Sequence, residues 1–429
     1  MGCTDADAQG LIGFVDASPS PRHAAQAIVE ALVAAGFQEL SLRAPRWQLG
    51  VGGFFVARGA TVIAWRLRGL AVTRFAAVGA HTDSPNLRLK PRAPYVNEGC
   101  LQFGVEVYGG ALWNSWLDRD LGLAGAVQTD DGRSHLVRVQ KPLARVTQLA
   151  IHLDRTVNEQ GLKLNPQLHL APLWGVARKE TDAAAEFHEL IARAAGVEAG
   201  RLVGHDLSLF DLTPSTLGGL GDTLVFAPRL DNLASCHAGL AALLDPTVAD
   251  GPADSVPMVA CFDHEEIGSA SADGADGVLL GTVIERVVAT LGGSREAYHA
   301  AVASSLMLSA DMSHAVHPNY ADKHEPRHKP FFGQGPVLKS NVNMRYATTP
   351  ETAGVLRALA RRNGLPLQDF VTRTDLGCGS TIGPITASRL GMPVVDLGAP
   401  MLSMHSAREC MAAADQASYC ALLRAHLLA

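Results

Sequence analysis

Short apolar runs alternate with amphipathic segments along most of this chain. The clearest run covers residues 256–262 and stops at an acidic segment; it is too short for most helices, so it predicts a buried strand. Similar runs predict strands at 53–58, 61–66, 75–80, 305–310 and 393–397. Apolar residues at helical spacing predict helices at 24–35, 183–195, 233–244, 281–291, 351–361 and 410–428. Alternating strands and helices favour an α/β fold, with a mixed, mostly parallel sheet flanked by helices.

The pattern changes between Pro91 and about Gly219, where Gly, Pro and aromatic residues mix with short alternating runs. Strand candidates at 123–128 and 135–140 flank the turn signal at 130–132. This region predicts an inserted, mostly β domain at 92–221, which interrupts a main domain formed by 1–91 and 222–429. Within it, residues 148–153 predict a strand that carries His152, and strand position alone favours a structural role for that histidine.

Composition narrows the classes of function. The chain has 429 residues, which favours two domains, and its net charge of −6 argues against nucleic acid or an anionic membrane as a partner. Seven cysteines, never spaced C-x-x-C, indicate neither a disulfide framework nor a thiolate zinc site. The first ten residues lack the basic and apolar parts of a signal peptide, and no stretch of 18 apolar residues occurs. We therefore expect a cytoplasmic protein that acts on small molecules.

The segment Asp-His-Glu-Glu-Ile-Gly-Ser at 263–269 follows the clearest strand and carries the strongest chemical signal. From an extended backbone, Glu265 and Glu266 point in different directions, so one can bind a cation while the other faces the water that this cation polarises. An isolated Glu-Glu pair is more often a solvated acidic turn. The pair becomes informative because other acidic and histidine residues occur at comparable positions elsewhere in the chain.

Other acidic and histidine side chains also occur at predicted strand ends or helix starts. His81 and Asp83 follow one strand and face the same side of it, so that one can ligate a metal while the other orients a ligand. Asp231 opens a helix, where an N-cap is the commoner role. Asp311 and His405 follow two further strands. Two histidines and three carboxylates can hold two divalent cations, most simply zinc, with manganese or cobalt as alternatives.

At these positions the chain resembles the aspartyl aminopeptidases, a family of exopeptidases with two cocatalytic metals. The resemblance covers nearly the whole chain, and its motifs are Gly79-Ala80-His81-Thr82-Asp83-Ser84-Pro85, Arg229-Leu230-Asp231-Asn232, Asp263-His264-Glu265-Glu266-Ile267-Gly268-Ser269, Asp311-Met312-Ser313-His314-Ala315-Val316-His317-Pro318-Asn319 and Met404-His405-Ser406-Ala407-Arg408-Glu409. It implies a zinc-exopeptidase-like fold, in which 1–91 and 222–429 form the catalytic domain and the insertion makes dimer contacts.

The resemblance also implies roles for single residues. His81 and Asp311 would ligate one metal, Glu266 and His405 the other, and Asp231 would bridge them. Glu265 would be the general base, with Asp83 supporting the site. Substrate contacts are implied at His314, Lys339 and Tyr346, and at His152 of a neighbouring subunit.

The expected activity is removal of N-terminal Asp or Glu from peptides by a homo-oligomer, of the tetrahedral dodecamer type. Lys339 would neutralise the acidic side chain of the substrate. Two enzyme alternatives use the same metal cluster: an aminopeptidase of broader specificity and an N-acyl amino acid deacylase. A self-assembling shell protein that has lost its chemistry is a third alternative, although an intact donor set argues against it.

Overall fold

A nine-stranded sheet forms the centre of the computed structural model, which describes residues 3–429. Its strand order is β1-β2-β3-β13-β4-β14-β18-β16-β17. Five of the neighbouring pairs are parallel, and three are antiparallel, which confirms the mixed, mostly parallel sheet. The strands are β1 (Gln38–Glu39), β2 (Gly52–Arg58), β3 (Thr61–Leu67), β4 (Arg74–His81), β13 (Ser255–Phe262), β14 (Leu306–Ala310), β16 (Val337–Ser340), β17 (Gln368–Val371) and β18 (Val394–Gly398).

Strand β13 is buried along its whole length because helices cover both faces of the sheet. Its side chains alternate between two hydrophobic cores: Val259 belongs to one and Met258 to the other. In the parallel pair with β4, Phe262 lies opposite His81. The residues that follow β13 are therefore brought beside the residues that follow β4.

Each face of the sheet has its own set of helices. One core includes side chains from α1, α2, α6, α9 and α11, and the other includes side chains from α7, α8 and α10. The bounds are α1 (Cys3–Ala17), α2 (Pro21–Ala34), α6 (Leu230–Leu244), α7 (Leu279–Thr290), α8 (Arg295–Ala303), α9 (Pro350–Arg362), α10 (Ile382–Leu390) and α11 (Ala413–Leu428). Within residues 3–429, every helix is too short or too polar to cross a lipid bilayer.

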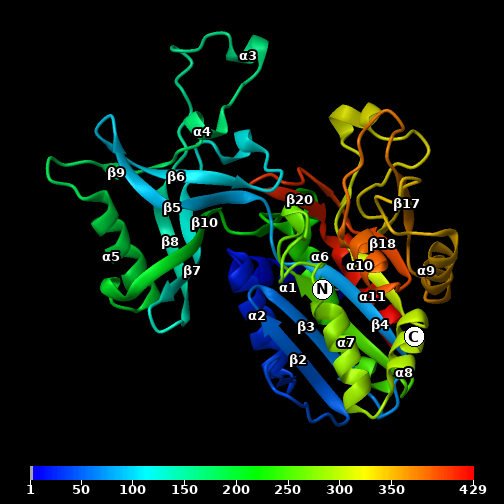
Figure 1. The fold of residues 1–429 in the computed structure, drawn as a ribbon. Coiled ribbons are helices and arrows are strands. Elements are labelled where there is room, and N and C mark those ends of the chain that lie inside the picture. The colour runs from blue at the N-terminus through cyan, green and yellow to red at the C-terminus, as the bar shows by residue number, and fades with distance from the viewer. Residues whose placement is uncertain (1–2) are drawn as a thin grey trace.

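A second, six-stranded sheet is entirely antiparallel and lies to one side of the first (Figure 1). Its order is β8-β7-β10-β5-β6-β9, and α5 (Ala183–Ala195) packs against it through Phe187 and Ile191. Its strands are β5 (Asn86–Asn97), β6 (Cys100–Tyr108), β7 (Leu121–Thr129), β8 (Ser134–Ala144), β9 (Leu173–Val176) and β10 (Leu202–Asp211). We call the segment from β5 to β10, residues 86–211, the insertion, because it interrupts the elements of the nine-stranded sheet.

A third sheet has the order β11-β12-β20-β19-β15 and uses residues that follow the insertion. Its strands are β11 (Thr216–Gly218), β12 (Leu224–Ala227), β15 (Ser313–His314), β19 (Pro400–Leu402) and β20 (Glu409–Ala412). The prediction that the last helix begins near residue 410 was wrong, since β20 comes first. The pairing of β20 with β12 and β19 overrides the local helical pattern.

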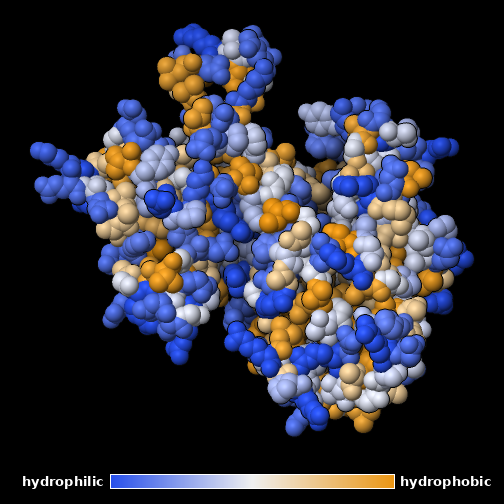
Figure 2. All heavy atoms as spheres, in the orientation of Figure 1, coloured by the Kyte–Doolittle hydropathy of each residue, from blue (hydrophilic) through white to orange (hydrophobic). Residues whose placement is uncertain are grey.

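Residues 147–169 form a protruding arm that contains α3 (Val157–Gln160) and α4 (Pro166–His169) (Figure 1). The predicted strand at 148–153 was wrong, because residues 151–153 form a turn in this arm. Leu149, Ile151 and Leu153 alternate as strand residues do, but they are all exposed. Apolar side chains are visible on the arm in the space-filling view (Figure 2).

Candidate metal centre

The acidic and histidine side chains of the strand ends meet in one place. His81, Asp231 and Asp311 bring one donor atom each to within 4.8 Å of one another, and Asp231, Glu266 and His405 do the same. Asp231 belongs to both of these groups, and His81, Glu265 and Glu266 form a third group with the same spacing. Carboxylate and imidazole donors gathered in this way can hold a divalent cation, as zinc sites rich in oxygen and nitrogen donors do.

The fold explains why these side chains meet although they are far apart in the sequence. His81 is the last residue of β4, and Asp311 directly follows β14, the parallel neighbour of β4. Glu265 and Glu266 lie in a 3-10 turn after β13. The carboxyl ends of parallel strands share one sheet edge, so this edge collects His81, Asp311 and the two glutamates, and α6 and the segment between β19 and β20 bring Asp231 and His405 to it.

Two buried oxygen atoms show that the site suits a cation. Asp231 Oδ1 and Glu266 Oε1 are buried and have no hydrogen-bond partner among the described residues. The nearby distances are 3.2 Å from His405 Nε2 to Asp231 Oδ2 and 3.4 Å from His405 Nε2 to Glu266 Oε2. Unpaired buried carboxylate oxygens are costly, and a divalent cation is the partner that their chemistry fits.

Asp83 connects several parts of the centre from a fully buried position. Its Oδ1 accepts a hydrogen bond from the Glu265 backbone N–H, and its Oδ2 accepts one from the Glu266 N–H, both at 3.1 Å. His81 Nδ1 lies 3.3 Å from Asp83 Oδ1. His81 Nδ1 is also 3.0 Å from the Asp83 backbone carbonyl oxygen, so Asp83 fixes the glutamate turn through its carboxylate and the His81 ring through both groups.

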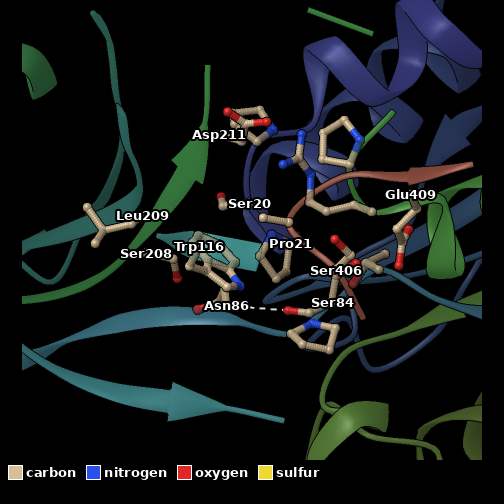
Figure 3. Close-up of a pocket in the computed structure, with 16 residues that line it drawn as sticks. Ser20, Pro21, Ser84, Asn86, Trp116, Ser208, Leu209, Asp211, Ser406 and Glu409 are labelled. Carbon is tan, nitrogen blue, oxygen red and sulfur yellow. Dashed lines mark hydrogen bonds between the residues drawn. The ribbon is translucent and has the colours of Figure 1, made fainter. Parts of the chain in front are cut away.

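Glu409 supports the opposite side of the centre. It accepts hydrogen bonds from the backbone N–H groups of Asp231 at 3.1 Å and His405 at 2.7 Å. Burial, with the negative Asp231 nearby, raises the pKa of Glu409 to about 8. Figure 3 shows Glu409 and Ser84 at the border of a cavity of about 20 Å³, which is also lined by residues of the insertion.

Glu265 has the position and the electrostatics of an acid–base group. Its Oε2 lies 3.9 Å from His81 Nε2, beside the donor cluster. Burial raises the pKa of Glu265 to about 8, and the negative Asp311 and Asp83 contribute in the same direction. A carboxyl group with a pKa near neutrality can both accept and return a proton at physiological pH.

The centre opens into a cleft of about 430 Å³. Lys339, His314 and Tyr346 line it, whereas His152 lies outside it, exposed on the arm. Lys339 Nζ donates to the Met312 carbonyl oxygen at 3.1 Å and lies 3.8 Å from Asp311 Oδ1. The lining consists of His81, Gly110, Asp231, Glu265, Glu266, Gly268, Asp311, Met312, His314, Lys339, Tyr346, Gly379, Ser380, Thr381, Ile385, Met404 and His405.

Some residues at the centre were not singled out from the sequence. Gly110 and the loop around Thr381 line the cleft, and Glu409 holds two metal-site residues through backbone contacts. The glycine pair at 109–110, directly after a strand, is a recognisable signal of close backbone approach. Glu409 ends the motif at 404–409, but the sequence gives no sign of its contact with the backbone of the distant Asp231.

Comparisons with known proteins place the chain in a family. Residues 14–427 match the model of the family described as "Aminopeptidase I zinc metalloprotease (M18)". A "Probable M18 family aminopeptidase 2" from Streptomyces avermitilis is 48% identical over 407 residues, which is 94% of each chain.

Comparison with solved structures supports the same family. The structure titled "Cryo-EM structure of the Ape4 and Nbr1 complex" has a TM-score of 0.94 and 37% identity, and the match covers 99% of this chain and 86% of that one. The "mApe1 dodecamer" of S. cerevesiae has a TM-score of 0.84 and 29% identity, with 98% and 96% covered. The chain therefore belongs to the M18 family of zinc metalloproteases and is a metallo-aminopeptidase.

Proposed function

We propose that this metallo-aminopeptidase removes acidic N-terminal residues, Asp or Glu, from peptides. The observation that carries the proposal is the position of Lys339, the one lysine or arginine in the cleft lining. It is 2% exposed, and a buried ammonium close to an open cleft favours a carboxylate ligand over a neutral one.

We assign two cations to the centre, both zinc, with manganese or cobalt as alternatives. His81 and Asp311 hold one cation, Glu266 and His405 hold the other, and Asp231 bridges them. The two donor groups that share Asp231 support this assignment. Bound cations supply Lewis-acid polarisation of a water molecule and of the scissile carbonyl.

Glu265 is the general base in this proposal. It takes the proton of the attacking water and returns it to the leaving amine, a role supported by its place beside the donor cluster, with Oε2 3.9 Å from His81 Nε2. Asp83 holds the Glu265 backbone, so that the carboxylate stays aimed at the cleft. His314 and Tyr346, both in the cleft lining, contact the substrate.

The working form is a homo-oligomer, with a tetrahedral dodecamer as the specific arrangement. In this form the domain at 92–221 makes dimer contacts, and His152 on the arm of one subunit reaches the cleft of its neighbour. The exposed Leu149, Ile151 and Leu153 support the proposal, because apolar side chains gathered on a protruding segment are typical of an interface. The dodecamer named for the S. cerevesiae relative supports it as well.

The test compares hydrolysis of otherwise identical peptides that begin with Asp, Glu or Leu, together with an N-acyl amino acid. Each substrate is assayed before and after chelation, and after zinc is restored. We expect turnover of the Asp and Glu peptides that is lost on chelation and regained with zinc. Equal turnover of the Leu peptide would indicate broad specificity, and turnover of the N-acyl amino acid alone would indicate a deacylase.

A further inference from the structure

The end of β6 reaches from the insertion to the metal centre. The Tyr108 hydroxyl donates a hydrogen bond of 2.7 Å to Asp83 Oδ2, the same oxygen that accepts from the Glu266 backbone. The Tyr108 side chain is buried, and the Arg88 guanidinium lies 4.2 Å from its ring centre. An aromatic residue of the six-stranded sheet is therefore part of the hydrogen-bond network around the glutamate turn.

Two glycines directly after Tyr108 bring the backbone of the insertion close to the metal centre. Gly109 has a φ of +69°, and a Cβ at this position would lie 3.1 Å from Glu266 Cβ and 3.4 Å from Glu266 O. A Cβ at Gly110 would lie 3.3 Å from His405 Nδ1. The backbone of the insertion thus rests directly on two of the metal-site residues, where a larger side chain would displace them.

The same segment also orients His405. Its Nδ1 lies 3.0 Å from the Gly110 carbonyl oxygen, so the ring donates there and presents Nε2 toward Glu266 and Asp231. In return, the Leu112 backbone N–H donates to the His405 carbonyl oxygen at 3.0 Å. The ring and the backbone of His405 are therefore both held by the short stretch that contains Gly110 and Leu112.

We propose that residues 108–112 are a positioning segment of the metal centre, and that the insertion is a structural part of the active site in each single chain. The segment contacts Glu266 and His405 directly, the pair at one cation position, whereas it reaches His81 at the other position only through Asp83. Its disturbance therefore weakens the position of Glu266 and His405 more than the other. This inference rests on the two-cation assignment made above.

The experiment uses two variants of the full chain, each with a matched control in the same sheet. Gly109→Ala is compared with Gly99→Ala, since Gly99 has a similar φ of +75° but nothing within 4 Å of its would-be Cβ. Tyr108→Phe is compared with Tyr95→Phe, which removes an equivalent hydroxyl from the partly exposed Tyr95. Zinc per chain is measured after dialysis against a competing chelator, together with zinc affinity and the thermal melting of the zinc-free protein.

We expect Gly109→Ala to retain one zinc per chain where wild type and Gly99→Ala retain two. Tyr108→Phe should bind its weaker zinc about tenfold less tightly than Tyr95→Phe does. The zinc-free melting temperature of Tyr108→Phe should fall modestly below that of Tyr95→Phe, because a buried hydrogen bond to Asp83 is lost, but by too little to account for the weaker zinc binding. If Gly109→Ala fails to fold, the proposal is tested by the comparison of Tyr108→Phe with Tyr95→Phe alone.

Wild-type zinc content and affinity in both variants would overturn the proposal. Equal loss of both zinc ions, or a drop in zinc-free melting that accounts for the lost affinity, would also overturn it, because either result indicates a general structural role. A wild-type content of one zinc would contradict the two-cation assignment instead. The segment's role would then be judged from the affinity for that single ion.

Discussion

Glu409 Oε1 accepts a hydrogen bond of 2.7 Å from the backbone N–H of His405, four residues earlier in the chain. His405 has a φ of +67°, a conformation that a histidine rarely adopts. The contact therefore stabilises an unfavourable backbone at the point where an imidazole enters the metal centre.

Glu409→Gln should weaken zinc binding by about 10 to 100-fold, equivalent to about 1 to 3 kcal/mol, because an amide can no longer accept both backbone hydrogen bonds. Isothermal titration of zinc into the zinc-free protein measures the change. Glu189→Gln, on the exposed face of α5, is the control for the same chemical change. Unchanged affinity in Glu409→Gln would show that the two contacts are dispensable.

Glu265→Gln and Glu266→Gln should fail in different ways. The first removes the proposed base without removing a ligand, so it should keep its zinc and lose turnover by a factor of about 100 to 10,000. The second removes a ligand and should lose zinc as well. Metal analysis and kcat of the purified variants separate the two effects, and equal zinc depletion in both would contradict the assignment.

Asp83→Asn should lower zinc affinity or kcat about 10 to 100-fold without unfolding the protein. The amide group would face the two backbone N–H groups of the glutamate turn with one oxygen in place of two. Zinc titration, kcat and thermal melting are measured together. Wild-type values throughout would reduce Asp83 to a buried acid with no influence on the site.

Lys339→Met should raise the barrier for substrates with an acidic N-terminal residue by roughly 2 to 5 kcal/mol, because it leaves the substrate carboxylate without its partner. Substrates with a neutral residue should change little. The measurement is the ratio of kcat/KM for Glu and Leu peptides in wild type and variant. A decline by the same factor for both would assign Lys339 to general support of the site, given its 3.8 Å distance from Asp311.

Stability should depend on pH through His426, which is 4% exposed and whose Nε2 donates to the Ala77 carbonyl oxygen at 3.1 Å. Burial lowers the pKa of His426 to about 4, below the value of about 6.5 in an unfolded chain. Between these values the unfolded state binds more protons, so stability falls as the pH falls through this range.

At pH 5 the loss from this one group should be about 2 kcal/mol relative to pH 8. His426→Gln keeps a neutral N–H donor that does not titrate, so it should remove that part of the pH dependence. Urea unfolding at pH 8 and pH 5 tests it, with His299→Gln on the exposed side of α8 as the control. An identical pH dependence in wild type and His426→Gln would contradict the prediction.

The sequence was informative wherever local pattern and final environment agree. The run at 256–262 predicts β13 because a strand covered on both faces must be apolar throughout. The clustering of His81, Glu265 and Glu266 was accessible because the parallel strands β4 and β13 deliver their ends to one edge. The roles assigned to these residues came largely from motifs and stay predictions.

The errors and omissions have physical causes. Leu149, Ile151 and Leu153 alternate like a half-buried strand, yet they form part of an exposed arm whose proposed partner is another subunit. The Tyr108 hydroxyl donates to a side-chain oxygen of Asp83, and Glu409 accepts from the distant Asp231 backbone, so no local pattern encodes these two contacts. Likewise, β20 becomes a strand through pairing with the distant β12 as well as with the neighbouring β19.

The order of strands in the central sheet also has a consequence for synthesis on the ribosome. Strands β14 and β18 lie inside the nine-stranded sheet, but they come from the last third of the chain. A nascent chain that stops before β18 has an open sheet edge at β14 and lacks His405, so buried carboxylates already stand together without all their partners. In the proposed arrangement, the cation position of His405 is therefore completed only after β18 has been made, and an unfinished chain presents an unpaired strand edge of the kind that favours aggregation.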